Sequence, residues 1–326
     1  MLVLTIGWVL MALLAPPFPS AASVVLTSSP TDVAREPELL EIGQPPKARS
    51  GAQLPQDIKV VSYNIRWRGG DDLKKLIKLL REDPEIGSAS ILGLQEVDRN
   101  KKRTGNKNTA AILAAELGMY YAWAAPASPA TEKEEETGVT ILSAYPLTDV
   151  RRIVLPHKGP GGRRRAAVGA TVKLGQASVR VYSVHSENRM KEDHKIEQMK
   201  AVIDDLASFD KDMRAIVLGD LNTWEPAVID KTFKLFTEQN FQTPFSKEST
   251  FLARALFIPI KLKLDWIWLR HLESTSHGID RAIKLSDHWP LWVVLRKPET
   301  LEHLRQSRNK GKSPLRFLAV SPTADW

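Results

Sequence analysis

Acidic, amide and imidazole side chains stand at the ends of several predicted strands of this 326-residue chain. In chain order, these residues are Asn64, Glu96, His185, Asp220, Asn222, Asp287 and His288. Strand ends in a sheet-based domain can meet at one rim, where binding residues concentrate. Several carboxylates on one rim repel each other unless a cation neutralises them, and a divalent metal ion does this well. The pattern therefore predicts a metal-dependent polar site.

Each of these residues has an ordinary explanation when it is taken alone. Asp220 and Asn222 could form only an Asx turn after a strand. Glu96 could be a solvated strand end, and His185 could be a histidine of the core. The prediction therefore rests on the whole set and not on any single member.

Apolar segments in the chain alternate irregularly between strand-like and helix-like spacing. Strands are predicted at 58–63, 90–94, 139–142, 166–174, 178–184, 215–218, 264–269 and 291–295. Helices are predicted at 73–80, with Asp71 or Asp72 as N-cap, at 109–117, closed by Gly118, at 196–206, and from Pro226 to 236. Hairpins mixed with helices favour two sheets packed on each other, with helices outside, over a doubly wound parallel sheet.

Seven short motifs in order give this chain a specific resemblance. They are Ser62-Tyr63-Asn64-Ile65-Arg66, Leu94-Gln95-Glu96-Val97, Gly138-Val139-Thr140-Ile141-Leu142-Ser143, Val184-His185-Ser186, Gly219-Asp220-Leu221-Asn222, Leu264-Asp265-Trp266-Ile267 and Ser286-Asp287-His288-Trp289-Pro290-Leu291. Together they resemble the endonuclease/exonuclease/phosphatase family, whose superfamily resembles DNase I. The resemblance covers residues 57–297 and implies a four-layered αββα sandwich, an α/β fold with two mixed sheets face to face.

The resemblance also implies hydrolysis of a phosphoester with the help of Mg²⁺, with Mn²⁺ as an alternative. Glu96 would be the main metal ligand, Asn64 would lie beside it, and Asp287 would add to the metal site or its surroundings. Mg²⁺ typically uses one or two carboxylates together with substrate phosphate.

The remaining motif residues are implied to act on the substrate. Asp265 would orient His288 and stabilise its charged form. Asp220 would position or deprotonate water, while Asn222 and His185 would donate hydrogen bonds to the phosphoryl oxygens. The sequence leaves open whether Asp220 or His288 is the base.

Three consecutive arginines, Arg163 to Arg165, precede the predicted strand at 166–174. Family members often carry a substrate-binding arginine at this place, and arginine can hold phosphate through two parallel hydrogen bonds. Such a run is more often a solvated loop, so only Arg165 is predicted to bind substrate.

Composition adds limits to these predictions. The chain has no cysteine, which excludes thiolate metal sites, disulfides and a cysteine nucleophile. Its formal net charge of +8 favours a polyanionic substrate or an anionic surface. Part of that excess lies after Arg296, which weakens the link between net charge and the site.

Four segments are predicted along the chain. Residues 1–22 are apolar and uncharged between Leu2 and Ala15 and are interpreted as a signal peptide, so we expect export to the periplasm or medium. Residues 23–56 are predicted to be a disordered linker, 57–297 the catalytic domain, and 298–326 a basic, largely disordered tail. A membrane anchor and a cytoplasmic location are the alternatives.

Three functional hypotheses are considered for a chain with these motifs. The first is a nuclease-type phosphodiesterase acting on DNA or RNA, which the basic charge favours. The second is a phosphatase or phospholipid phosphodiesterase of the same family, although Leu264-Asp265-Trp266-Ile267 departs from the inositol-phosphatase motif and residues 186–190 depart from the sphingomyelinase motif. The third is an inactive binding protein, which the complete motif set disfavours. A monomer without an obligate protein partner is predicted.

Overall fold

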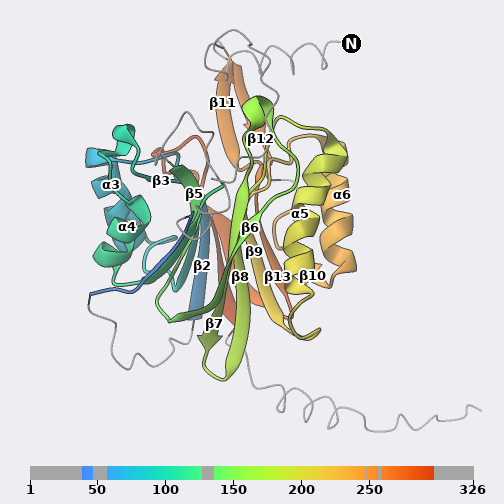
Figure 1. The fold of residues 1–326 in the computed structure, drawn as a ribbon, viewed down its shortest axis with the longest axis horizontal. Helices are drawn as coiled ribbons and strands as arrows, with labels where there is room; N and C mark the ends of the chain where they lie inside the picture. The colour runs from blue at the N-terminus through green and yellow to red at the C-terminus, as the bar shows by residue number, and fades with distance from the viewer. Residues whose placement is uncertain (1–38, 47–56, 127–135, 247, 256–257, 297–326) are drawn as a thin grey trace, which may run out of the picture.

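Two large β-sheets pack face to face and carry helices on their outer sides (Figure 1). The computed structural model describes residues 39–46, 57–126, 136–246, 248–255 and 258–296. The layers run helix, sheet, sheet, helix, so the predicted four-layered αββα sandwich is confirmed.

The first sheet has seven strands with one parallel pair in its middle. Their spatial order is β1 (Leu40–Gly43), β4 (Tyr120–Ala124), β5 (Glu136–Ser143), β3 (Ile91–Arg99), β2 (Asp57–Asn64), β15 (Leu291–Arg296) and β14 (Ser274–Ile279). The parallel strands β2 and β3 are joined through helix α3 (Gly70–Glu82), and α4 (Thr109–Leu117) lies beside α3 on the same outer face. All other neighbouring strands of this sheet are antiparallel.

The second sheet has six strands and again one parallel pair. The order is β10 (Phe241–Gln242), β13 (Asp265–Arg270), β9 (Arg214–Asp220), β8 (Ala177–His185), β7 (Ala166–Leu174) and β6 (Leu147–Val154). Helix α5 (Glu192–Leu206) joins the parallel strands β8 and β9, and α6 (Pro226–Glu238) packs beside it. A separate hairpin of β11 (Phe251–Ala255) and β12 (Ile258–Leu262) projects from the end of the sandwich.

Alternation along the strands explains why the layers form. On β2, Ile58 and Val60 point into the core between the sheets, whereas Val61 and Tyr63 point toward α3 and α4. Successive strand side chains point to opposite faces, so a strand that is apolar on both faces must be covered on both. Each fully buried side chain of this kind contributes about 1.5–3 kcal/mol.

Several local predictions need correction. The linker predicted over 23–56 is wrong at Leu40–Gly43, because this segment pairs with β4 as an edge strand. Helix α3 begins after Gly69 and not after Asp71 or Asp72. The sequence pattern also does not predict strands β4, β6, β10, β11, β12 and β14. The signal peptide at 1–22 and the tail at 298–326 lie outside the described residues and stay predictions.

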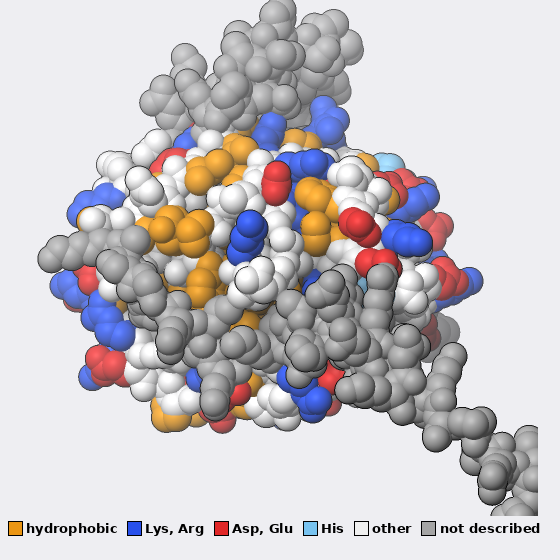
Figure 2. Space-filling view, turned by 90° about the horizontal axis from the view of Figure 1, so that it is seen from below, with side chains coloured by type: hydrophobic (Ala, Val, Ile, Leu, Met, Phe, Trp, Pro, Cys, Tyr) orange, Lys and Arg blue, Asp and Glu red, His pale blue; other side chains and the backbone are white. Residues whose placement is uncertain are grey.

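Figure 2 views the molecule from below Figure 1. Where described side chains are visible on this face, acidic and basic side chains are interspersed around hydrophobic ones. Within the described ranges, no helix has the length and apolar character needed to cross a bilayer.

Candidate active site

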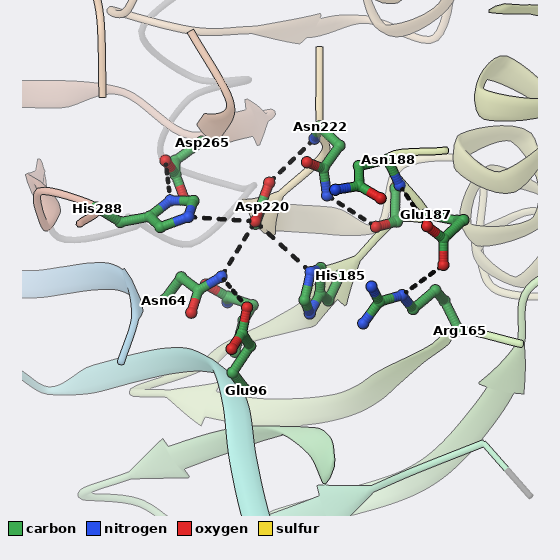
Figure 3. A network of polar contacts seen from close by, with 12 residues as sticks. Asn64, Glu96, Arg165, His185, Glu187, Asn188, Asp220, Asn222, Asp265 and His288 are labelled. Carbon is green, nitrogen blue, oxygen red and sulfur yellow. Dashed lines mark hydrogen bonds and ion pairs between the residues drawn. The ribbon is translucent and has the colours of Figure 1, made fainter. Parts of the chain in front are cut away.

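Strand register brings the predicted residues to one end of the sandwich. On the second sheet, His185 of β8 lies opposite Asp220 of β9, which lies opposite Asp265 of β13. On the first sheet, Asn64 of β2 lies opposite Gln95 of β3. Because the two sheets face each other, Asn64 reaches Asp220 across the gap with Nδ2 donating to Oδ2 at 3.1 Å. The site is therefore shared between the sheets (Figure 3).

Gly219 shapes the backbone immediately before Asp220. Its φ is +138°, and a Cβ at this position would lie 2.0 Å from the carbonyl oxygen of Val184 on the neighbouring strand. Only glycine permits both this conformation and this close approach. The Gly-Asp order of the motif is therefore a structural requirement of the β8–β9 pair.

The carboxylate of Asp220 is the centre of the polar network. Besides the bond from Asn64, its Oδ2 atom lies 3.6 Å from His185 Nε2 and 3.7 Å from His288 Nε2. Its Oδ1 atom accepts the backbone N–H of Asn222 at 3.0 Å. Both imidazole contacts are longer than hydrogen bonds, so these ring nitrogens stay available to another acceptor.

His288 and Asp265 form a buried pair. The Nδ1 atom of His288 lies 2.8 Å from Asp265 Oδ2, and both side chains are almost fully enclosed. Burial alone lowers the pKa of His288, but the carboxylates of Asp265 and Asp220 outweigh burial and raise the pKa to about 10. His288 is therefore an imidazolium at neutral pH, with one N–H fixed by Asp265 and the other directed at Asp220.

Thr250 holds this pair from the side of the β11–β12 hairpin. Its hydroxyl oxygen accepts the backbone N–H of Asp265 at 2.9 Å, and its carbonyl accepts the N–H of Trp289 at 2.8 Å. The ring of Phe251 meets the His288 ring edge-on, with centroids 4.8 Å apart. The hairpin therefore fixes the orientation of His288 and shields it from solvent.

His185 and Asp220 differ from His288 in protonation. Burial lowers the pKa of His185 well below its ordinary value, and the positive charges of Arg165 and His288 lower it further. Burial raises the pKa of the Asp220 carboxyl to about 7, against the opposing charge of His288. The site thus combines a neutral imidazole, a cationic imidazole and a carboxyl that titrates near neutral pH.

Glu96 occupies a bulge in strand β3. The register between β3 and β5 shifts between Gln95 and Val97, so Glu96 has no partner opposite and adopts a left-handed backbone with φ of 56°. Its Oε1 atom accepts Asn64 Nδ2 at 3.3 Å, and its carbonyl accepts the N–H of Trp67 at 3.0 Å. Bulges of this kind redirect a side chain beside an active site.

The site contains several other left-handed residues that are not glycine. Arg66, Trp67 and Asn222 have φ angles of 49°, 48° and 52°. Each such conformation costs roughly 1–3 kcal/mol and persists only when its surroundings enforce it. Here the N–H of Arg66 donates to Asn64 Oδ1 at 3.1 Å, which fixes the amide of Asn64 with Nδ2 toward the carboxylates.

The donor set at Glu96 fits a hard cation. Among the described residues, the Glu96 carboxylate has no lysine or arginine partner, and it is only half-buried at the rim. Mg²⁺ prefers such carboxylate oxygens. Asp220, Asp265 and His288 also bring potential ligand atoms within 4.8 Å of one another, and this buried group could hold a metal ion. Because the Asp265 carboxylate is already paired with His288, the unpaired Glu96 carboxylate is the better ligand for a hard cation.

Two residues predicted for the metal site have other contacts. Asn64 acts as a donor to Glu96 and Asp220, because its oxygen is taken by the N–H of Arg66. Asp287 forms an ion pair with Arg66, with Oδ2 2.8 Å from Nη1. The structure thus brings Asp287 to the site but pairs its carboxylate with an arginine.

Asn222 lies beside the loop that follows β8 in the second sheet. Its Nδ2 donates to the carbonyl of Ser186 at 2.9 Å, so the side chain ties the segment after β9 to the segment after β8. Its carbonyl accepts Lys195 Nζ at 3.2 Å, and Lys195 also pairs with Glu225 at 2.7 Å. Lys195 has no exposed surface, so it fixes the turn that carries Asp220 and Asn222.

The three arginines of the run 163–165 differ in their contacts with the site, and the substrate-binding role of Arg165 stays a prediction. Arg165 Nε donates to Glu187 Oε2 at 3.1 Å, and its charge acts on His185. Arg163 acts on His185 more weakly. Arg164 is exposed and contacts none of the site residues within the described part of the chain.

Sequence reasoning missed Glu187 and Lys195. A usable signal was present on α5, whose inward face carries Met199 and Val202 but also the polar residues Lys195 and Gln198. Polar side chains on a buried helix face need partners, so they indicate a nearby polar network.

The fold and this site define a class of protein: an α/β sandwich whose strand ends gather an Asp–His pair, a central carboxylate and a rim glutamate. A family model described as the PGAP2IP C-terminal nuclease-like domain matches residues 57–240. The chain therefore belongs to the endonuclease/exonuclease/phosphatase family, whose members are hydrolases acting on phosphoesters.

Solved structures show the same fold at low sequence identity. An endonuclease/exonuclease/phosphatase from Beutenbergia cavernae is 17% identical, with 74% of this chain and 72% of that chain covered and a TM-score of 0.60. ANGEL2, a 2′,3′-cyclic phosphatase, is 14% identical, with 73% and 95% covered and a TM-score of 0.55. The human Nocturnin catalytic domain is 19% identical, with 75% and 96% covered and a TM-score of 0.54. No curated protein matches the chain.

Proposed function

We propose that this protein is a divalent-metal-dependent phosphodiesterase of the nuclease type. The observation that carries the proposal is the convergence on Asp220 of a neutral imidazole, a cationic imidazole and the amide that also holds Glu96. A phosphodiester hydrolase needs to activate water, neutralise charge on the phosphoryl oxygens and assist the leaving oxygen. The proposed roles divide these tasks among the residues.

Asp220 is proposed as the general base. It lies at the centre of the network, and its pKa near 7 suits proton transfer at neutral pH. His288 is unsuited to that role because Asp265 keeps it protonated. The proposal therefore takes Asp220 as the base where the sequence leaves both Asp220 and His288 open.

The two histidines are proposed to bind the phosphoryl group. The Nε2 atoms of His288 and His185 both lack a hydrogen bond to Asp220, so their N–H groups can reach a phosphoryl oxygen. The imidazolium of His288 then opposes the negative charge that develops in the transition state. Asn222 is proposed to shape the pocket and to donate only if its bond to Ser186 opens.

A metal ion bound at Glu96, with Asn64 orienting the carboxylate, would supply a positive charge for the phosphoryl oxygen and the leaving oxygen. We propose Mg²⁺ because the donor at the rim is a carboxylate, and Mn²⁺ would serve in its place.

A groove beside the site supports a polyanionic substrate such as DNA or RNA. It has a volume of about 680 Å³ and runs from α3 to Leu285, next to the loop that carries Asp287 and His288. Its lining has four basic side chains and three acidic ones: Arg68, Lys75, Lys78 and Lys284 against Asp72, Glu82 and Asp83. Arg68 and Lys75 both pair with Asp72, so Lys78 and Lys284 are the basic groups without a carboxylate partner among the described residues. Basic side chains along such a path favour a phosphate backbone.

The test is a substrate panel with and without a chelator. Plasmid DNA, RNA, bis(p-nitrophenyl) phosphate, p-nitrophenyl phosphate and sphingomyelin vesicles are incubated with the protein in Mg²⁺, Mn²⁺ or EDTA. We expect cleavage of nucleic acid and of the simple diester that EDTA abolishes. Preference for the monoester or for vesicles would instead support the phosphatase or phospholipid phosphodiesterase alternative.

Variants separate the metal site from general damage. Glu96→Gln should lower turnover at least about 100-fold, because a carboxylate ligand is lost. The control is Glu238→Gln at the exposed end of α6, which makes the same chemical change far from the site. Full activity of Glu96→Gln, or turnover that persists in EDTA, would contradict the mechanism.

A further inference from the structure

The loop between β8 and α5 contains a buried carboxylate that the proposed mechanism does not use. Glu187 lies two residues after His185 and is only 4% exposed. Its Oε1 atom accepts the backbone N–H groups of Asn188 and Arg189 at 3.0 and 3.1 Å, and its Oε2 atom accepts Arg165 Nε at 3.1 Å (Figure 3). A buried carboxylate is costly unless it is paired, and here three donors satisfy it.

The backbone of Glu187 is fixed as firmly as its side chain. Its N–H donates to Gln198 Oε1 at 2.8 Å, and the fully buried Gln198 donates through Nε2 to the carbonyl of Pro156 at 2.9 Å. Gln198 therefore ties the Glu187 loop to the segment that leads into β7. Gly159 of that segment lies so close that a Cβ there would be 2.7 Å from the Glu187 carboxylate.

The ion pair leaves a defined part of Arg165 free. Only Nε contacts Glu187, and neither terminal nitrogen of Arg165 has a partner among the described residues. In Figure 3 the terminal nitrogens of Arg165 lie on the side of the guanidinium that faces His185. A free edge with two parallel N–H groups matches the geometry of two phosphate oxygens.

Arg165 is the arginine that the family resemblance predicts to bind substrate, and its free edge would form the subsite for phosphate oxygens. We propose that Glu187 is a positioning residue that directs this edge toward His185. The proposal rests on the proposed function only in that the substrate is a phosphoester. A purely structural Glu187 would hold the loop without affecting how Arg165 binds an anion. These two roles make different predictions for the pair of residues.

The experiment measures binding of inorganic phosphate to the full chain in EDTA by isothermal titration calorimetry. The variants are Arg165→Met, Arg165→Lys, Glu187→Gln and the double variant Glu187→Gln/Arg165→Met. Arg165→Met should weaken binding about tenfold or more, because a charge-assisted bond to phosphate is lost. Arg165→Lys keeps the positive charge but lacks the two parallel N–H groups of the guanidinium. It should therefore bind phosphate more tightly than Arg165→Met but more weakly than the wild type.

The coupling between the two residues is the decisive readout. Glu187→Gln alone should weaken phosphate binding about threefold to tenfold, whereas in the Arg165→Met background it should change binding less than about twofold. Equal effects in both backgrounds, or unchanged binding in Glu187→Gln, would overturn the positioning role. If Glu187→Gln does not fold, near-wild-type phosphate binding by Arg165→Lys would overturn the proposal instead, because lysine has no guanidinium edge for Glu187 to direct.

The matched control is Asp205→Asn, which weakens a different ion pair, between Arg180 of β8 and Asp205 of α5. Asp205 pairs with the buried Arg180 at 3.1 Å and also accepts the hydroxyl of Tyr182 at 2.7 Å, away from the site. It should leave phosphate affinity unchanged even where the melting temperature falls. Absence of phosphate binding by the wild type would overturn the subsite, whereas absence of diester turnover with this binding pattern intact would count only against the proposed function.

Discussion

Replacing Asp265 by asparagine should change both catalysis and the pH dependence of stability. The substitution keeps the size of the side chain but removes the charge that lies 2.8 Å from His288 Nδ1. Burial then acts on His288 with less opposition, so the pKa of His288 falls from about 10. His288 loses its fixed orientation and much of its positive charge at neutral pH.

The magnitude for stability follows from the pKa of His288 in the folded and unfolded chain. That pKa rises from 6.5 to about 10 on folding, and each unit corresponds to about 1.4 kcal/mol, so the full effect is at most about 5 kcal/mol. Because the folded pKa is raised, this stabilisation is complete below pH 6.5 and is lost as the pH rises toward 10. Folding raises the pKa of Asp220 from 3.8 to about 7, so the ionised carboxylate is disfavoured in the folded state. Asp220 therefore lowers the free energy of unfolding as the pH rises from about 3.8 to about 7.

The assay compares urea unfolding of wild type and Asp265→Asn at pH 6.5, 8 and 10. Between pH 6.5 and pH 10, deprotonation of His288 should lower the free energy of unfolding of the wild type by up to about 5 kcal/mol. The same change in the variant should be less than about half as large. The difference between the two curves reports mainly on His288, with a smaller contribution from Asp220, because the charge of Asp265 raises the pKa of both groups. Asp204→Asn, an exposed change on α5, serves as control.

Catalysis is measured on the same samples with bis(p-nitrophenyl) phosphate and Mg²⁺. Asp265→Asn should lower kcat about 10²- to 10⁴-fold with little change in KM, because His288 acts mainly as charge develops. A variant whose kcat stays within threefold of wild type, or whose stability falls with pH as steeply as wild type, would refute the reasoning about the Asp265–His288 pair.

Three further predictions concern the elements that hold the site. Gly219→Ala should cost at least about 3 kcal/mol in urea unfolding or prevent folding, because its Cβ would strike the backbone of the neighbouring strand; Gly161→Ala, with φ of +72° and open space, should cost about 1 kcal/mol. Lys195→Met should lower the free energy of unfolding by about 3 kcal/mol, since it leaves Glu225 without its buried partner, and should lower kcat more than it raises KM. The kcat profile of the wild type should rise with pH through about 7 as Asp220 loses its proton, and an Asp220→Asn variant should be inactive across the range.

The sequence predicted the elements whose pattern is local and strong. The 166–174 and 178–184 segments form the expected hairpin β7–β8, and Pro226 and Gly118 bound their helices as expected. The polar strand ends meet as predicted because register, set by buried alternation, places His185, Asp220 and Asp265 side by side.

Other features depend on long-range packing and were not predictable in this way. Edge strand β1 is four residues long and is defined only by its pairing with β4. The pairing of Arg66 with Asp287 joins residues 221 positions apart, and the bulge at Glu96 arises from its mismatch with β5. No local pattern in the sequence encodes such partners, because each is chosen by the surface that another segment presents.

Strand β15, the last strand of the sandwich, pairs with β2, the second strand along the chain, and the loop before β15 carries His288. The ribosome synthesises the chain from the N-terminus to the C-terminus, so Asn64 and Glu96 are present long before His288 is added. Every fragment that stops short of β15 therefore leaves an open slot beside β2 and lacks the Asp265–His288 pair. Assembly of the site therefore waits for the segment that leads into β15, because His288 is the last of the site residues to be synthesised.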